Sequence, residues 1–117
     1  FEVCKPERIA MPEWIPEDLP LPKGTYASEE EMSVSGYRRA FLIWPPGFTN
    51  DEVRHFVFDE WPEAGFRIGR QDSEYGEVEA ELHHSPAEGA FKILTTACHP
   101  RYRVLYLIYA PTGPNPR

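Results

Sequence analysis

The chain lacks the features that mark several large classes of protein. Its sequence contains no apolar run that approaches the roughly 20 residues needed for a membrane-spanning helix. Positive charge is scarce, because 12 lysines and arginines stand against 19 aspartates and glutamates, a formal net charge of −7. A chain without a broad basic field is not expected to bind nucleic acid. Its acidic balance would instead attract a basic protein partner.

Cysteine is nearly absent, since the chain contains only Cys4 and Cys98. Cys4 lies in a polar stretch that cannot bury a thiol unaided, which favours a disulfide bond between the two. Such a bond would hold the N-terminal segment against the folded region and would place the protein in an oxidising, extracytoplasmic compartment. The alternative is two unrelated free thiols, with Cys98 buried as a small apolar side chain.

Motifs for catalysis and for cofactor binding are also missing. Residues 65–69 contain two glycines, but they have neither the spacing nor the strand-to-helix context of a phosphate-binding loop. Cys98 and His99 are neighbours in the chain, and adjacent residues on a strand rarely bring an imidazole to face a sulfur. We therefore expect a non-catalytic protein that uses no cofactor.

The four histidines do not have the spacing of a metal site. His83 and His84 are adjacent, which sends their side chains to opposite faces of a strand, and His55 falls in the predicted helix. No pair has the helical i, i+4 spacing of zinc ligands, and no Cys-x-x-Cys cluster is present. We expect no metal site. The alternative is a site built from His83 or His84 with His99 and a glutamate.

Proline is concentrated at both ends of the chain. Residues 1–24 contain five prolines, and residues 111–117 contain three. Because proline fixes φ and cannot donate a backbone hydrogen bond, we predict extended segments on both sides of a domain at residues 25–110. Trp14 and Ile15 make the first segment too apolar for a free linker, so we expect it either to lie against the domain or to bind a partner.

One stretch marks the start of a helix. Thr49 can cap the helix and Glu52, three residues later, can bond back to it, which is a capping box. Phe48 and Val53 have the spacing of a hydrophobic staple. The helix is predicted to end near Pro62, which lacks the amide proton that would continue it. The apolar stripe that would pack on a sheet consists of Val53, Phe56, Val57 and Trp61.

The remaining segments alternate with the period of two that is typical of strands. Five strands are expected, at residues 37–44, 66–70, 77–83, 91–98 and 102–110. With the helix after the first strand, the order is β-α-β-β-β-β, an α+β fold in which one helix packs on one face of an antiparallel sheet. The preceding polar stretch, residues 25–35, is expected to be a solvated strand edge or a loop.

The last predicted strand is apolar on both faces, which indicates that neither face is solvated. Residues 104–109 run Val-Leu-Tyr-Leu-Ile-Tyr. Two arrangements account for this run. The strand lies at the centre of the sheet, or it is covered by the helix on one face and by the N-terminal segment on the other.

A row of glutamates is the strongest candidate for a binding surface. Glu77, Glu79 and Glu81 alternate along one predicted strand, so their side chains share a face and lie about 7 Å apart. Such a row repels itself unless basic side chains on neighbouring strands face it. The structural interpretation is therefore cross-strand ion pairing. The functional interpretation is docking of a basic partner or a weak calcium site, although calcium needs oxygen ligands at a higher density than this row provides. The basic residues on adjacent predicted strands are Arg67, Arg70, Lys92, Arg101 and Arg103.

Aromatic side chains indicate a second kind of surface. A helix that crosses a curved sheet can leave a cleft at one end, and such clefts are the usual place for a ligand. The cleft is expected near Phe58, Trp44 and Tyr75. The residues that could line a groove for a sugar or a peptide are Trp44 with Tyr37, Tyr75, Tyr102, Tyr106 and Tyr109. The alternative is ordinary cross-strand packing of half-buried aromatic rings.

The order of elements resembles two groups of proteins. The run Leu-Pro-Leu-Pro-Lys-Gly-Thr at residues 19–25, followed by an apolar strand, the capped helix, the turn at residues 64–66 and two hairpins, resembles small uncharacterised secreted or lipid-anchored bacterial proteins. The element order alone also resembles the helix-on-sheet modules of outer-membrane assembly lipoproteins. This resemblance implies a cell-envelope location and an interaction role, with no catalytic residue.

These observations together predict an extracytoplasmic binding or assembly module that contacts a protein partner. The alternative is a small-molecule or carbohydrate binder that uses a cleft between helix and sheet.

Overall fold

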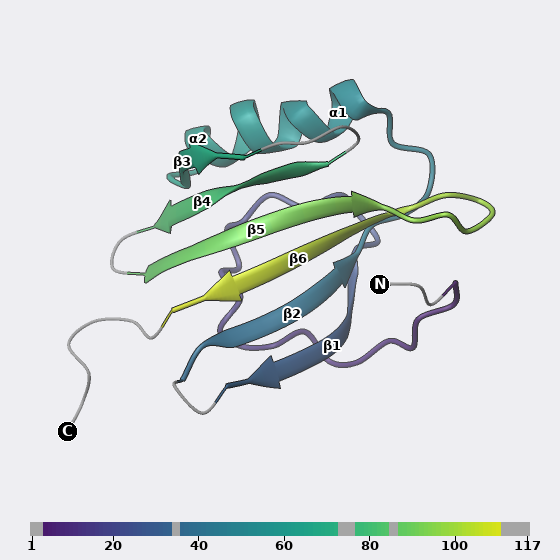
Figure 1. The fold of residues 1–117 in the computed structure, drawn as a ribbon, viewed down its shortest axis with the longest axis horizontal. Coiled ribbons are helices and arrows are strands. Elements are labelled where there is room, and N and C mark those ends of the chain that lie inside the picture. The colour runs from purple at the N-terminus through teal and green to yellow at the C-terminus, as the bar shows by residue number, and fades with distance from the viewer. Residues whose placement is uncertain (1–3, 34–35, 73–76, 85–86, 111–117) are drawn as a thin grey trace.

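The computed structural model describes residues 4–33, 36–72, 77–84 and 87–110 of the chain. These residues form an α+β fold of two layers (Figure 1). One layer is a six-stranded antiparallel sheet. The other layer consists of one helical stretch and the N-terminal segment, which pack on the sheet as a single buried cluster. The proline-rich segment predicted at residues 111–117 lies outside the described residues.

The sheet contains one strand more than the sequence predicts. Its strands are β1 (Tyr26–Met32), β2 (Arg38–Ile43), β3 (Arg67–Gln71), β4 (Val78–His84), β5 (Ala87–Thr95) and β6 (Arg103–Tyr109). They lie in the order β1-β2-β6-β5-β4-β3, and each pairs with its neighbours in antiparallel fashion. The predicted α+β class is confirmed, and so is the central position of the last strand.

The two faces of the sheet differ in what covers them. Alternation along β6 sends Leu105 and Leu107 to one face, where both are 0% exposed beneath the helix and the N-terminal segment. We call this the covered face. Tyr106 and Ile108 point to the opposite face, which we call the open face, and both are only half-buried. Directly paired residues on neighbouring strands share a face, so this division extends across the sheet.

The helix begins as the sequence predicts. The Glu52 N–H donates to Thr49 Oγ1 at 3.1 Å, and the Thr49 N–H donates to Glu52 Oε1 at 2.9 Å, which completes the capping box. At its other end Gly65 has φ +96°, the left-handed conformation of a helix C-cap. The Phe66 N–H donates back to the Trp61 carbonyl at 2.9 Å, which closes the last turn.

A π-helical turn interrupts the helix before Pro62. α1 (Asn50–His55) continues into η1 (Phe56–Glu60) and then α2 (Trp61–Glu63), and the Trp61 N–H donates to the carbonyl of Phe56, five residues back. A π-turn is wider than an α-turn and rotates less per residue. That geometry keeps Val53, Val57 and Trp61, spaced four residues apart, on one stripe, where all three are 0% exposed.

The N-terminal segment is a strap of tight turns, where an extended chain was predicted. We call residues 4–24 the strap. The Ile15 N–H donates to the Pro12 carbonyl and the Leu19 N–H to the Pro16 carbonyl, both at 3.2 Å. The two turns repeat the sequence Pro-Glu-x-apolar at residues 12–15 and 16–19. Each turn directs its fourth residue inward, since Ile15 is 5% and Leu19 4% exposed, which confirms that the segment lies against the domain.

The strap and the helix cover the same face of the sheet. Trp61 Nε1 donates to the Pro20 carbonyl at 2.6 Å, and Ile15 belongs to the same buried cluster as Val57. The interpretation that placed them on opposite faces of the last strand is therefore wrong. A single helix is about 10 Å wide and six strands span about 24 Å, so one helix leaves much of a face uncovered. The strap covers the remainder.

β1 replaces the solvated edge or loop expected at residues 25–35. Its alternation is hidden because a β-bulge between Ala27 and Glu29 shifts the register within the strand, and such a bulge places two residues opposite one. Ala27 is buried, whereas the last four residues of the strand are exposed. The Ile9 N–H donates to the Ala27 carbonyl at 2.9 Å, so the strap also forms a bridge with the outer edge of β1.

A disulfide bond joins Cys4 to Cys98, as predicted, across 94 residues of sequence. Cys98 belongs to a small buried cluster with Ile43, Tyr102 and Val104. Ile43 and Val104 are paired across β2 and β6, and both lie on the open face because they alternate with covered-face residues. The disulfide therefore fixes the start of the strap at one end of the open face.

Candidate functional site

The open face carries a stripe of half-buried apolar side chains across its three central strands. Phe41 on β2 and Tyr106 on β6 are directly paired, and their ring centroids lie 4.9 Å apart. Ala90 on β5 pairs with Ile108 in the same way. The stripe consists of Phe41, Ala90, Leu94, Tyr106 and Ile108, all of which are half-buried.

The described segments that pack over the sheet are on the other side of it. The helix and the strap side chains Trp14, Ile15, Leu19 and Leu21 belong to the covered-face cluster. In Figure 1 the strap (purple) runs behind the sheet, and the helix lies along its upper edge beside β3 and β4. The disulfide end is the exception. There Cys98 and Tyr102 pack against Val104, and the strap contacts Tyr26 of β1 through the Pro6 carbonyl and the Arg8 guanidinium. Beyond that end, the stripe faces outward in the described part of the structure.

The acidic row is partly neutralised by its neighbours. Glu79 on β4 is paired with Lys92 on β5 across the open face. Lys92 Nζ lies 3.4 Å from Glu77 Oε2, although Glu77 precedes the first residue of β4. These two contacts favour cross-strand ion pairing as the role of this part of the row.

Glu81 is held by hydrogen bonds from its neighbours. Its Oε1 accepts from the Arg70 backbone N–H at 3.2 Å and lies 3.3 Å from His83 Nε2. The Arg70 backbone hydrogen bond, followed by the contact with His83, lowers the pKa of the Glu81 carboxyl, because both favour its charged form. Glu81 therefore has a structural role at the β3–β4 edge.

The candidates for an aromatic cleft do not come together. Trp44 is 1% exposed and packs edge-on against Phe48 and Phe56, with ring centroids 5.7 and 5.4 Å away. It therefore presents no surface to a ligand. Phe58 lies beneath the guanidinium of Arg54, 4.9 Å from its ring centroid. Tyr75, the third candidate, lies outside the described residues.

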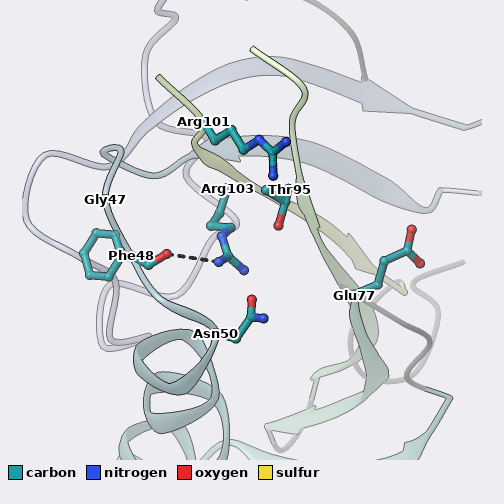
Figure 2. Close-up of a pocket in the computed structure, with 7 residues that line it drawn as sticks. All are labelled: Gly47, Phe48, Asn50, Glu77, Thr95, Arg101 and Arg103. Atoms are coloured by element: carbon teal, nitrogen blue, oxygen red, sulfur yellow. Dashed lines mark hydrogen bonds between the residues drawn. The ribbon is translucent and has the colours of Figure 1, made fainter. Parts of the chain in front are cut away.

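A polar cleft lies instead at the N-terminal end of the helix. It has a volume of about 580 Å³ and opens between the loop before α1 and the adjoining ends of β5 and β6. In Figure 2 the guanidinium groups of Arg101 and Arg103 lie between the loop at Phe48 and the strand at Thr95. Its described lining residues are Gly47, Phe48, Asn50, Glu77, Thr95, Arg101 and Arg103.

Arg103 is the fixed element of this cleft. It pairs with Thr95 across β5 and β6, and its Nη2 donates to the Phe48 carbonyl at 3.0 Å. Burial lowers the pKa of its guanidinium from the usual value, because desolvation disfavours the charged form. It forms an ion pair with none of the described carboxylates. The prediction that assigned it to the acidic row overlooked that Arg103 shares the face of Leu105, opposite to that of Glu79.

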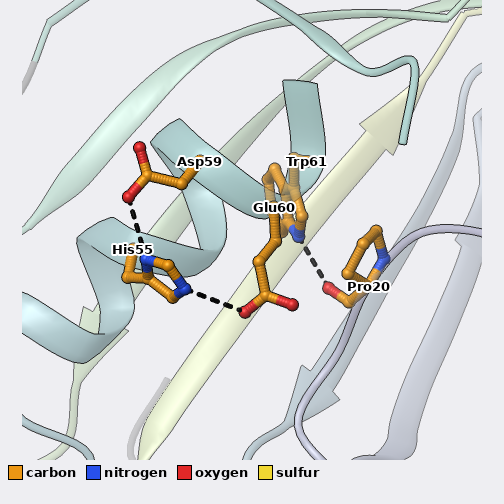
Figure 3. Close-up of polar contacts among 5 residues, drawn as sticks. All are labelled: Pro20, His55, Asp59, Glu60 and Trp61. Atoms are coloured by element: carbon orange, nitrogen blue, oxygen red, sulfur yellow. Dashed lines mark hydrogen bonds and ion pairs between the residues drawn. The ribbon is translucent and has the colours of Figure 1, made fainter. Parts of the chain in front are cut away.

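His55, His83 and His84 have partners that account for their positions. His55 Nδ1 lies 2.8 Å from Asp59 Oδ2, and its Nε2 lies 3.6 Å from Glu60 Oε2 on the outer surface of the helix (Figure 3). The His84 ring stacks on Phe66 with a centroid distance of 4.0 Å. Within the described residues, no group of three His, Cys, Asp or Glu side chains is arranged to hold a metal ion.

Comparisons with known proteins return no relatives. No family model, no curated protein and no solved structure matches this chain. Among the described helices, none is long and apolar enough to span a membrane. The surfaces of the described residues that could bind another molecule are the open face and the cleft.

Proposed function

We propose that this domain is a non-catalytic binding module whose open sheet face contacts a protein partner outside the cytoplasm. The observation that supports this most directly is the unequal cover of one sheet. The helix and the strap bury one face, whereas the apolar stripe at Phe41, Tyr106 and Ile108 is left half-buried on the other. Apolar patches ringed by polar residues are typical of protein-interaction surfaces.

Charge around the stripe favours a basic partner. Glu29 and Glu31 lie on the β1 side, opposite Phe41 and Arg39 in the register, and Glu79 lies on the β4 side. Two basic side chains share this face, Arg39 beside Ile108 and Lys92 beside Tyr106, and Lys92 is paired with Glu77. With a net charge of −7, the protein would increase the rate at which a basic partner associates with it. The partner would thus combine an apolar contact at the centre of the stripe with basic groups at its rim.

The extracytoplasmic location is supported by the disulfide bond between Cys4 and Cys98. Structural disulfides persist in oxidising compartments and are rare in the cytosol. The same location is implied by the resemblance to secreted and lipid-anchored bacterial proteins. The partner is therefore to be sought among proteins of that compartment.

The experiment is capture of the partner by the tagged domain from the extracytoplasmic fraction of its native host. A double substitution, Leu94→Lys with Ile108→Lys, places two positive charges on the stripe. The matched control, Met11→Lys with Met32→Lys, adds the same charge at residues that are 43% and 65% exposed and lie off the open face. We expect the wild-type and control proteins to retain the same partner and the stripe variant to lose it.

Two results would contradict this proposal. One is capture of the partner by the stripe variant at the wild-type level while that variant remains folded by circular dichroism. The other is the recovery of no protein by the wild-type domain together with a bound small molecule in its native mass spectrum. The second result would support the alternative function, a small-molecule or carbohydrate binder, for which the cleft at Arg103 is the favouring observation.

A further inference from the structure

The cleft beside Arg103 has the size of a ligand site and several convergent polar groups. Its volume of about 580 Å³ lies within the range of about 300 to 1,000 Å³ that is usual for small-molecule sites. The polar groups are the Thr95 hydroxyl, the Asn50 amide and two guanidiniums. Phe48 presents its carbonyl to Arg103 in Figure 2, and its ring points away to pack on Trp44 and Phe56.

Arg103 is prepared to bind an anion. One of its donors is used by the Phe48 carbonyl, which fixes the side chain, whereas a guanidinium has five N–H donors in all. None of the described carboxylates pairs with it, although the protein is acidic overall. A half-buried guanidinium with donors to spare is a suitable partner for a carboxylate, which it can bind through two parallel hydrogen bonds.

Groups beside Arg103 add a second positive charge and further hydrogen-bonding side chains to the cleft. Arg101 lines the same cleft, and Figure 2 shows its guanidinium on the same side of β6 as that of Arg103, near Thr95. The Asn50 side chain points toward Arg103. A hydroxyl and an amide can each donate and accept hydrogen bonds, so Thr95 and Asn50 suit hydroxyl groups on the ligand.

Glu77 does not cancel the positive charge of the cleft. Its carboxylate is on the far side of the cleft from Arg103 in Figure 2, and it is paired with Lys92. Two guanidiniums against this one carboxylate leave the lining favourable to an anion. A carboxylate on a hydroxylated skeleton can also reach Thr95 and Asn50 across a cleft of about 580 Å³, whereas inorganic phosphate is too small to do so.

We infer that this cleft binds a small hydroxylated carboxylate, such as a sugar acid, with the carboxylate on Arg103 and Arg101 and the hydroxyls at Thr95 and Asn50. This inference deepens the alternative function and is independent of a partner on the open face. The cleft lies at the ends of β5 and β6 on the covered-face side, so the same domain has room for both occupants.

The test is an NMR titration of the whole chain with D-glucuronate at constant ionic strength. D-glucose, which lacks the carboxylate, and inorganic phosphate are titrated in parallel. We expect glucuronate to cause saturable shifts of the Arg103 Nε–H and of the Thr95 and Asn50 amides, glucose to cause none, and phosphate to bind more weakly. Absence of saturable shifts with glucuronate, or tighter binding of phosphate, would overturn the inference.

Three substitutions that each remove one positive charge distinguish a specific binding site from non-specific electrostatic attraction of the anion. Arg103→Gln should weaken glucuronate binding at least tenfold, or about 1.4 kcal/mol, and Arg101→Gln should weaken it by a smaller factor. Arg38→Gln is the matched control, since Arg38 is exposed and pairs with Tyr109 at the opposite end of β6. If Arg103→Gln does not fold, Arg101→Gln carries the test. Equal weakening by Arg38→Gln would show that no specific site exists.

The same titration distinguishes this inference from the open-face proposal. The variant Leu94→Lys with Ile108→Lys alters the stripe and leaves every described lining residue of the cleft in place. It should therefore lose the protein partner and still bind glucuronate. Arg103→Gln should show the reverse, with retention of the partner and loss of the carboxylate.

Discussion

The covered and open faces belong to the same strands, yet they bury their side chains to different extents. On β6 the neighbours Leu107 and Ile108 differ by one position in sequence, and Leu107 is 0% exposed whereas Ile108 is half-buried. The strand itself is equally apolar on both sides. The difference arises from the elements that the chain supplies from elsewhere, the helix and the strap, and both are used on one side.

The contact between Trp61 and Pro20 explains why one side receives both elements. The Trp61 indole N–H is deep in the core and finds its acceptor in the strap at 2.6 Å. An indole buried without an acceptor would cost about 1 to 3 kcal/mol. The strap therefore satisfies a polar group that the helix buries, which couples the two elements on one face and leaves the other face available.

The largest expected effect comes from freeing the strap. Cys4→Ser with Cys98→Ser removes a crosslink that spans 94 residues, and loop entropy predicts a loss of about 4 to 5 kcal/mol in the free energy of unfolding. The measurement is urea unfolding followed by tryptophan fluorescence. Wild-type protein in a reducing agent is the control and should unfold at the same urea concentration as the variant. A loss below about 1 kcal/mol would mean that the strap is held by its other contacts.

The second prediction tests the comparison within a single strand. Leu107→Ala should lower the free energy of unfolding by about 3 kcal/mol, because it leaves a cavity in a fully buried site. Ile108→Ala removes a side chain of the same size from the open face and should cost about 1 kcal/mol, since water already reaches that position. The two variants are compared by chemical unfolding under identical conditions.

Equal losses for the two alanine variants would contradict the division into faces. A large loss at Ile108 would show that another segment or a second molecule covers the open face in solution. In that case the loss should depend on protein concentration if a second copy is the cover.

Much of the architecture follows from short-range patterns in the sequence. The capping box at Thr49 and Glu52 depends on residues three positions apart, and it forms as predicted. The hairpin of β5 and β6 likewise follows from alternation on either side of a turn. The disulfide was predictable because Cys4 lies in a polar stretch that cannot bury a free thiol, and Cys4 is indeed exposed while its partner Cys98 is buried.

The predictions that were wrong concern the packing of distant segments against each other, which the alternation of residues along a strand does not encode. The sequence shows that β6 is apolar on both faces. Which element packs on which face depends on where the strap crosses the sheet, and alternation along a strand carries no information on that. The repeated Pro-Glu-x-apolar turns ending at Ile15 and Leu19 were the available signal, because they point apolar residues inward at a fixed spacing. β1 escaped recognition because its bulge after Ala27 breaks the period of two.

The cleft was missed for a related reason. Arg103 was grouped with the acidic row by charge, whereas its position in the alternation of β6 places it on the side of Leu105 and Leu107. Alternation along β6 and β4 predicts that Arg103 and Glu79 lie on opposite faces of the sheet. The loop at Phe48 that forms the other wall comes from a distant part of the sequence, and no local pattern places it there.

The smallest expected effect contrasts two tyrosine hydroxyls on β6. Tyr109 lies on the covered face, and its buried hydroxyl has no hydrogen-bond partner among the described residues. Tyr106 lies on the open face, and its hydroxyl accepts from Arg39 Nη1 at 3.4 Å. Tyr109→Phe should therefore leave the free energy of unfolding unchanged or raise it by about 1 kcal/mol, whereas Tyr106→Phe should lower it slightly.

The pH dependence of the free energy of unfolding provides a second test of the difference between Tyr109 and Tyr106. Burial, followed by the charge of Asp18, raises the pKa of Tyr109 to about 12, above the value of about 10 for an unfolded chain. The neutral phenol thus contributes stability that is fully present below about pH 10 and is lost as the pH rises through the folded pKa. Tyr109→Phe should remove this alkaline loss, measured by urea unfolding at a series of pH values, because phenylalanine does not ionise. If the loss persists in Tyr109→Phe and disappears in Tyr106→Phe, the buried phenol is on the other face, and the distinction between covered and open faces must be reversed.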